Sequence, residues 1–562
     1  MSQNSESSTV TGSGTTGRRS FLKQATVAGS AAALAATAGC IDDGDDEVDD
    51  AGDPLPSFEY YNNPEDYNPA RHDLINIVAE NLQEVGLDVE VEVLEWATLL
   101  SAVLDEYDFG MSTWSQFPGV DPAPTITDRF TSDHAEEPGL GNYHGYQDDR
   151  MDELIDIQNE TTDEQERIDA LHEIQEKVAE DVPFHPFLME LEMVPHLDDQ
   201  LTGFVDHISG YSEINSYANV QPLDENEDNQ LRGFWTEALE NLNLWDHASL
   251  SKHTHLQDAL QERVMVMDGD LEHDVELSVA TGIERPDEET IVLEIRDDGS
   301  WSDGEPMTAA DVEFTYQTII DQSPSQWSTA ASLLESVELI DDDTVELGLS
   351  QPLGIAAEAQ VLEGIYVAPK HVWEGVDPVE DELVEDPVCG GMMEVEYWDV
   401  GQEIQLVARD DHRLDFDIEG IYWEIIPETA TIWEMTERGE INYHPFAQPS
   451  RELYEGEQDV DNLEIQTVEG SGWTHLNINM RDPPLDEQAV RQAIAHAVPK
   501  DTLSEEVYYD FYPSAHSLIN PSYGDLHNPD VKQYDQSLES AQETLEDAGF
   551  VITDDGVHYP AE

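Results

Sequence analysis

The chain has 562 residues, of which 126 are acidic and 22 are basic, so its formal net charge is −104. This charge excludes a nucleic-acid binder that neutralises phosphates, and it disfavours adhesion to anionic lipid through basic patches. The length exceeds that of one ordinary hydrophobic core, so two or three domains are expected.

The charge and the composition together predict a folded protein that is adapted to salt. Low hydrophobicity with high net charge can indicate disorder, but 11 Trp, 20 Tyr and 14 Phe are spread along the chain. Self-repulsion strains a compact fold, and it fades at about 1 M salt, where the Debye length is roughly 3 Å. The alternative is an acidic protein from a cell at ordinary salt.

The first fifty residues predict an export and anchoring signal. Arg18 and Arg19 lie in a twin-arginine pattern, and an Ala- and Gly-rich apolar run, Ala25–Gly39, follows them. The run ends at Cys40 in a lipoprotein-like cleavage box. We therefore expect a signal peptide over residues 1–40 with lipidation at Cys40, an acidic tether over 41–53, and a lipid-anchored location on the extracellular face of the membrane.

The next part of the chain alternates predicted strands and helices. Strands are expected at 58–61, 88–93 and 109–114, and helices at 73–85 and 98–104, from their periodicity and stop signals. This order is typical of a parallel sheet with helices on its faces.

The later part of the chain continues the α/β pattern. A solvated linker is expected at 221–230. The other expected elements are helices at 167–179, 309–320, 490–498 and 537–548, and strands at 289–295, 344–349, 404–408, 421–426 and 473–480. A capping pair, Thr308 and Asp311, opens the helix at 309.

Several stretches resemble the extracellular solute-binding proteins of ABC importers, in the peptide/nickel-binding family (family 5), of haloarchaeal type. The stretches are Trp301–Val312, Tyr366–His371, Asn477–Leu485, Tyr146–Leu154 and Val182–Phe187. The resemblance implies an α/β, two-lobed periplasmic-binding-protein-like fold of class II with an extra subdomain. Such a fold closes over its ligand by a hinge motion.

The order of the blocks differs from the usual family order, which predicts a circular permutation. The family's first block lies here at 234–562 and its last block at 54–220. Pro54 and Tyr559 are then expected within roughly 15 Å of each other, because the ends of compact domains often lie close together. One ligand-binding lobe is expected to combine 54–150 with 470–562, and the other to span 151–469 with the extra subdomain.

The resemblance also implies the ligand-binding residues. It points to Trp114, Ser115, Gln116 and Phe117, and Phe117 stands where peptide-binding relatives place an Asp that holds the ligand's ammonium group. The later Asp121 looks like a separate family Asp-Pro that is more often structural.

Four further residues are candidates for the cleft. Trp473 and His475 begin the expected strand at 473–480, and the alternative for Trp473 is a place in the core. Ser249 and His253 follow a segment that resembles the family's first cleft edge. His253 and His255 are not expected to bind metal, because an i,i+2 spacing on a helix separates their side chains.

These observations predict a cell-surface lipoprotein that captures a small solute and delivers it to ABC permease subunits. The expected solute is a peptide or a related compound. A metal–chelator complex or a sugar is the alternative ligand, and a secreted peptidase or esterase is the alternative function. The sequence contains no GxSxG, HExxH or P-loop motif, so no enzyme activity is expected. Neither a cofactor nor a nucleic-acid partner is expected, and the protein is expected to be a monomer.

Overall fold

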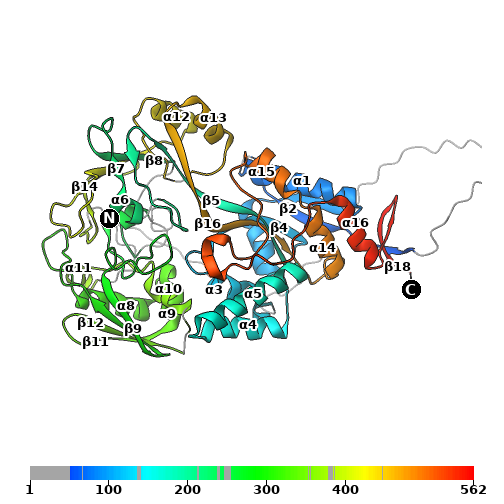
Figure 1. Ribbon diagram of the computed structural model, residues 1–562, viewed down its shortest axis with the longest axis horizontal. Coiled ribbons are helices and arrows are strands. Elements are labelled where there is room, and N and C mark those ends of the chain that lie inside the picture. The colour runs from blue at the N-terminus through cyan, green and yellow to red at the C-terminus, as the bar shows by residue number, and fades with distance from the viewer. Residues whose placement is uncertain are drawn as a thin grey trace, which may run out of the picture. The chain divides into compact units, whose positions relative to one another are not determined.

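The computed structural model describes residues 51–561 with several gaps (Figure 1). The gaps are 66, 136–140, 212–213, 237–240, 246–254, 352–353, 355, 377–383, 385–386 and 446, together with the side chains of 356–358. The expected leader with Cys40, and the segment with Ser249 and His253, lie outside the described residues. Among the helices that are described, none is both long and apolar enough to cross a membrane.

A five-stranded sheet in the order β3-β2-β4-β16-β5 contains the strands expected early in the chain. Strand β2 is parallel to β3 and β4, whereas β16 is antiparallel to β4 and β5. The three expected strands are confirmed and are parallel to one another as expected. The whole sheet is mixed, because β16 enters it between β4 and β5 in the opposite direction. The strands are β2 (Phe58–Asn62), β3 (Val89–Val93), β4 (Met111–Gln116), β5 (Phe184–Leu197) and β16 (Leu463–Ile478).

Helices pack around this sheet, and their ends follow local sequence signals. Helix α1 (Pro69–Val85) begins where the side chain of Asn68 accepts a hydrogen bond from the backbone N of Arg71. It ends at Gly86, whose φ of 105° suits glycine. The other helices here are α2 (Trp96–Leu100), followed by the π-turn Ser101–Glu106, α3 (Ala123–Phe130), α4 (Asp149–Glu160), α5 (Glu164–Asp181), α14 (Gln488–Ala497), α15 (Lys500–Val507) and α16 (Leu538–Asp547). The helices expected in this region are confirmed.

Strands β5 and β16 continue beyond the five-stranded sheet. Their pairing is interrupted between Glu469 and Trp473, and residues 463–469 then pair with 191–197. At the far end the backbone N of Leu197 donates to the carbonyl of Asn442 at 2.9 Å. In Figure 1 the two strands lead from the five-stranded sheet toward β8 and α12. The strand expected at 473–480 is therefore the second half of a much longer strand.

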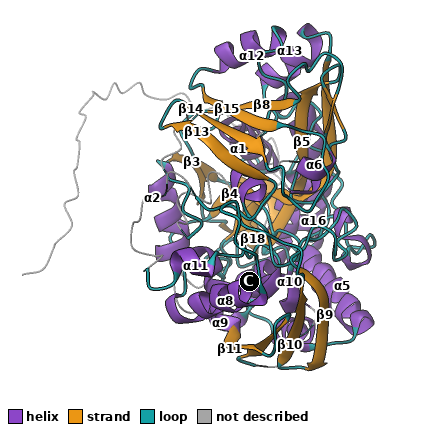
Figure 2. Ribbon diagram, turned by 90° about the vertical axis from the view of Figure 1, so that its left-hand side faces the viewer, coloured by secondary structure: helices purple, strands orange, loops and turns teal. Residues whose placement is uncertain are grey.

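Two four-stranded sheets make up the middle of the chain, and Figure 2 shows both. One is β11-β12-β10-β9, with strands Leu334–Leu339, Thr344–Leu349, Thr290–Ile295 and Ala280–Asp287. It packs with helices α8 (Ala309–Gln322), α9 (Ser328–Leu333), α10 (Ala356–Leu362) and α11 (Lys370–Trp373), and the expected capping box of Thr308 and Asp311 is confirmed. The other is β13-β14-β15-β8, with strands Met393–Asp399, Glu403–Ala408, Gly420–Ile425 and Gln230–Trp235. Beside it lie α6 (Ile214–Asn219), α12 (Thr429–Glu437), α13 (Arg451–Asp459) and the short strands β6 (Leu201–Thr202) and β7 (Gln221–Pro222).

The two ends of the described chain lie side by side. Strand β1 (Ala51–Pro54) pairs with β18 (Gly556–Pro560), which in turn pairs with β17 (Val551–Thr553). The backbone N of Leu55 donates to the carbonyl of Val557 at 2.9 Å. The expected proximity of Pro54 and Tyr559 is confirmed.

Two details concern the expected boundaries between segments. The solvated linker expected at 221–230 is wrong in part, because it begins with β7 and contains the buried Asn226. Helices α4 and α5 share a hydrophobic core with Trp473 and Leu518, which belong to the first predicted lobe. The division into lobes remains a prediction, and this shared core favours a first lobe that includes α4 and α5.

Candidate functional site

The pairing of β4 with β16 brings together five of the predicted binding residues. Gln116 lies opposite Trp473, Ser115 opposite Thr474, and Trp114 opposite His475. Because facing residues of an antiparallel pair project to the same side of the sheet, Trp114 and His475 share one face. Their ring centroids are 5.7 Å apart.

Trp473 and His475 are buried, with 1% and 0% of their surface exposed. Both rings pack against Phe184, at centroid distances of 5.8 and 4.3 Å. Burial holds the pKa of His475 well below its usual range, so its imidazole is neutral. In this structure the two residues belong to the core, so they can affect a ligand only through the residues they support.

Phe117, by contrast, is half exposed at the end of β4. Its ring lies directly over the backbone of Gly472, where a Cβ would stand 2.4 Å from Phe117 Cδ1. A glycine at 472 is therefore required for this contact. Beside it, Gln116 Oε1 accepts a hydrogen bond from Nη2 of Arg129 at 3.2 Å.

The segment that follows Phe117 leads into a pocket of about 960 Å³. Figure 1 shows α3 and α5 on one side of this region and β9 and α10 on the other. The volume lies within the range of about 300–1,000 Å³ typical of small-molecule sites. The lining residues come from segments far apart in the sequence: Val120, Asp121, Glu164, Arg167, Ile168, Met265, Met267, Gly269–His273, Ile283, Ala359 and Pro521–Leu526.

One wall of the pocket is built on a buried ion pair. Nη2 of Arg167 donates to both carboxylate oxygens of Asp121 at 2.8 and 2.6 Å. The same carboxylate accepts from the backbone N of Ala123 at 2.8 Å, at the start of α3. The hydroxyl of Tyr523 donates to the carbonyl of Gly119 at 2.5 Å. These bonds hold the loop after Phe117 in place, and the structural role expected for Asp121 agrees with them.

The chemistry of the lining is acidic and apolar. Glu164, Asp270, Glu272 and Asp525 contribute carboxylates, while the guanidinium of Arg167 is already paired. The side chains of Met265, Met267, Leu271 and Ile283 supply apolar and polarizable surface. Such a lining suits a solute that combines cationic or amide groups with apolar groups.

Glu190 is a residue near the site that the sequence analysis missed. It lies on β5 at the break between β5 and β16, and only 2% of its surface is exposed. The hydroxyl of Thr474 donates to its carboxylate at 2.8 Å, and burial raises its pKa. An acidic residue inside the apolar run of residues 184–191 was the available signal, because buried carboxylates are rare.

Replacing Glu190 by Gln is expected to raise the melting temperature at neutral pH. Since the pKa of Glu190 is raised on folding, its protonated form contributes stability below the unfolded-state pKa, and that contribution is lost as the pH rises through the folded-state pKa. The amide does not ionise and avoids this loss. Thermal melts in high salt at about pH 7.5 and pH 5 should show a larger increase in the melting temperature of E190Q at the higher pH. The control E59Q, at an exposed position, should show no increase at either pH. An equal gain at both pH values would contradict the assignment.

The described residues contain no cluster of three or more His, Cys, Asp or Glu side chains that could hold a metal ion. The pocket is lined by carboxylates and apolar side chains, and Phe117 lies three residues before Val120, the first residue of its lining.

Comparison with known proteins gives one family. Residues 274–561 match the family model described as bacterial extracellular solute-binding proteins, family 5 Middle. The oligopeptide-binding protein AppA of Bacillus subtilis is 24% identical over 355 residues, which cover 61% of this chain and 59% of that protein. The dipeptide-binding protein of Escherichia coli is 24% identical over 221 residues, 39% of this chain and 41% of the relative. The chain thus matches less than two thirds of the length of these relatives.

Solved structures give a similar result. The structure of Bacillus subtilis AppA in complex with a nonapeptide has a TM-score of 0.44 at 22% identity, and the match covers 58% of this chain and 65% of that one. The structure of NikA from Brucella suis in complex with Fe(III)-EDTA has a TM-score of 0.48 at 19% identity, with 58% and 65% covered.

Proposed function

Because the chain belongs to family 5 of the bacterial extracellular solute-binding proteins, we propose that it captures a solute in the cleft beside Phe117 and presents it to the permease subunits of an ABC importer. The observation that carries the proposal is the 960 Å³ pocket, which is lined by segments from both predicted lobes. Strands β5 and β16 connect these lobes and could serve as the hinge. In this role the protein binds its solute without altering it, and works as a monomer.

We propose a peptide as the ligand. Two of the relatives carry the names oligopeptide-binding and dipeptide-binding protein, which supports this choice. The carboxylates of Glu164, Asp270 and Glu272 would attract cationic groups, and the Met and Ile side chains would cover apolar side chains. A peptide without a free amine near Phe117 fits best, since an aromatic ring cannot neutralise an ammonium ion as a carboxylate does.

Native mass spectrometry on protein purified in high salt tests the ligand class directly. A retained mass that fragments into amino acids supports the proposal. A retained metal–chelator complex or oligosaccharide would contradict the proposal of a peptide ligand and would still support the solute-binding function. Turnover of added peptide or ester by the purified protein would instead support a hydrolase.

Replacing Phe117 by Ala is expected to weaken ligand binding about tenfold, as for a typical aromatic contact residue. The melting temperature should change little, because the ring is half exposed. Isothermal titration with the retained ligand measures the affinity. The matched control is Tyr397→Ala, which removes an exposed aromatic ring from β13. Equal affinities of F117A and wild type would exclude Phe117 from the site.

We also propose that the protein reaches the cell surface by the twin-arginine route and is anchored through Cys40. The support is the order of Arg18, Arg19, the apolar run and the cysteine in the sequence. The intact mass of protein extracted from membranes tests it: a diacylglyceryl adduct on the wild type, absent in Cys40→Ser, is expected.

Finally, we propose a circularly permuted order of the family's segments. The family match at 274–561 and the pairing of β1 with β18 support this order. A variant that joins residue 561 to residue 51 and opens the chain near 230 should fold with an unchanged melting temperature, because Ala51 already lies opposite Pro560.

A further inference from the structure

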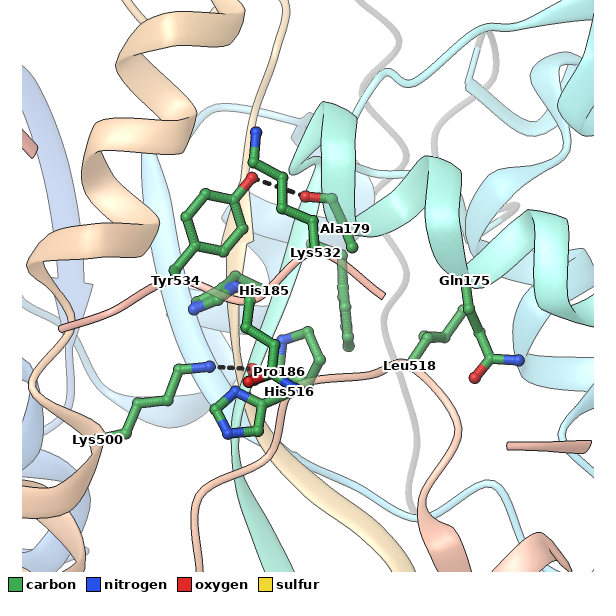
Figure 3. Close-up of a pocket in the computed structure, with 11 residues that line it drawn as sticks. Gln175, Ala179, His185, Pro186, Lys500, His516, Leu518, Lys532 and Tyr534 are labelled. Atoms are coloured by element: carbon green, nitrogen blue, oxygen red, sulfur yellow. Dashed lines mark hydrogen bonds between the residues drawn. The ribbon is translucent and has the colours of Figure 1, made fainter. Parts of the chain in front are cut away.

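A second, small pocket lies between α5, the first residues of β5 and the segment 500–534, and basic side chains line it (Figure 3). It contains two of the six lysines of the chain, Lys500 and Lys532, and two histidines, His185 and His516. No carboxylate lines it. In a chain with a net charge of −104 this composition is unexpected. The complete lining is Gln175, Ala179, Phe184, His185, Pro186, Lys500, His516, Leu518, Lys532, Gln533 and Tyr534.

Lys500 is the most deeply buried of these groups, with no exposed surface. Its ammonium donates to the carbonyl of Ala515 at 2.7 Å and to that of Pro186 at 3.4 Å. An ammonium has three N–H donors, so one donor remains for another acceptor. None of the ion pairs among the described residues includes Lys500. Burial lowers its pKa to about 7, and the nearby carboxylate of Asp501 opposes this shift only in part.

The two histidines bring further polar ring nitrogens to the same place. Nε2 of His185 and Nδ1 of His516 are buried and have no hydrogen-bond partner. His185 is 5% exposed, and burial, together with the nearby Lys500, lowers the pKa of both imidazoles, so each neutral ring carries a single N–H. Figure 3 shows the Lys500 ammonium with His185 and His516 on either side. Buried polar groups are normally hydrogen-bonded, so the spare ammonium donor of Lys500 beside two ring nitrogens without a partner points to a bound species.

The size of the pocket limits what this species is. Its volume of about 10 Å³ holds one particle of roughly the size of a water molecule. A phosphate, a sulfate or the carboxylate of a peptide is too large. We infer that the pocket binds one monatomic halide anion, chloride or bromide, through the Lys500 ammonium and the ring N–H groups of His185 and His516.

The anion would join three segments that are distant in the sequence: β5 through His185, the start of α15 through Lys500, and the loop that carries His516. It would stabilise their packing by mass action, and the effect would grow with halide concentration. The site lies apart from the 960 Å³ pocket and shares no lining residue with it. Binding of an anion here is therefore independent of the proposed solute-binding function.

Crystals grown in sodium bromide test the assignment directly. Anomalous diffraction at the bromine edge should show a peak within hydrogen-bonding distance of Lys500 Nζ. An ordered water without anomalous signal at this position would overturn the inference. This measurement uses the wild-type protein, so it does not depend on whether a variant folds.

A solution experiment gives an independent result. At constant sodium concentration and ionic strength, replacing chloride by gluconate, which cannot enter the pocket, should lower the melting temperature of the wild type. The difference between chloride and gluconate should shrink markedly in Lys500→Met. It should persist in the control Lys370→Met, whose half-exposed ammonium pairs with Glu313 at 3.2 Å. An equal anion effect in wild type and K500M would contradict the inference.

Discussion

Transfer from high salt to dilute buffer is expected to abolish the cooperative fold of residues 51–561. At a net charge of −104, repulsion between carboxylates opposes the compact state. At about 1 M salt the Debye length is roughly 3 Å, but at 0.01 M it is roughly 30 Å, so repulsion then acts across much of the molecule. Near-ultraviolet circular dichroism and tryptophan fluorescence, followed as NaCl is lowered, should show a sigmoidal loss of tertiary structure.

The distribution of charge gives the physical reason. Acidic side chains project from exposed faces such as β3, where Glu90 and Glu92 face solvent. Several of the few arginines, in contrast, serve the interior. Arg263 pairs with the buried Asp258 at 2.6 Å, and Arg409 donates to the carbonyls of Cys389, Gly390 and Gly391. With only 22 basic residues for 126 acidic ones, most of the surface carboxylates are left without a counter-charge.

Two controls separate screening from other effects of salt. Sucrose at matched osmolality is excluded from protein surfaces but does not screen charge, so it should restore much less structure than NaCl. Sodium gluconate screens charge as NaCl does, so it should restore most of the structure and leave only the smaller difference expected for the basic pocket. Unchanged melting in dilute buffer would contradict the salt adaptation itself.

The sequence predicted the regular elements well where one face of each is polar. The strand at 344–349 and the helix at 309–320 alternate clearly between buried and exposed positions, and their bounds agree with the structure to within two residues. The length of β16 was missed because Gly470, Ser471 and Gly472 interrupt its alternation. The sequence carries no local signal that β16 pairs antiparallel with β4 and β5, because this pairing depends on which distant segment supplies the neighbouring strand.

The candidate site was predicted only in part, for a related reason. In a central strand that is covered on both sides, both faces are buried, so alternation cannot separate a core residue from a cleft residue. Trp473 lies in β16 and Phe117 directly follows the neighbouring strand β4. Both are aromatic, yet one is buried and the other is half exposed. The acidic pocket could not be predicted at all, since Asp121, Glu164, Asp270 and Asp525 meet only in the folded chain.

Replacing Asp121 by Asn is expected to destabilise the protein by about 3–5 kcal/mol, the usual cost of leaving one partner of a buried ion pair without its counter-charge. Asp121 and Arg167 keep only 11% and 8% of their side-chain surface exposed, so water cannot replace the lost carboxylate. Asn keeps the size of the side chain and can still accept from the backbone N of Ala123, which isolates the effect of charge. Urea denaturation in high salt measures the loss.

The double variant D121N/R167M tests whether the lost stability comes from the unpaired guanidinium of Arg167. If the cost arises from an uncompensated guanidinium, removing the guanidinium as well should recover much of the stability, since an apolar replacement of a buried pair is often neutral. The exposed pair of Arg150 and Glu173 is the control, and E173Q should cause a far smaller change because both side chains are more than 40% exposed. Should D121N melt like the wild type, the pair does not hold the pocket wall. Should the double variant regain stability but bind ligand weakly, the pair orders the loop after Phe117 for binding as well as for folding.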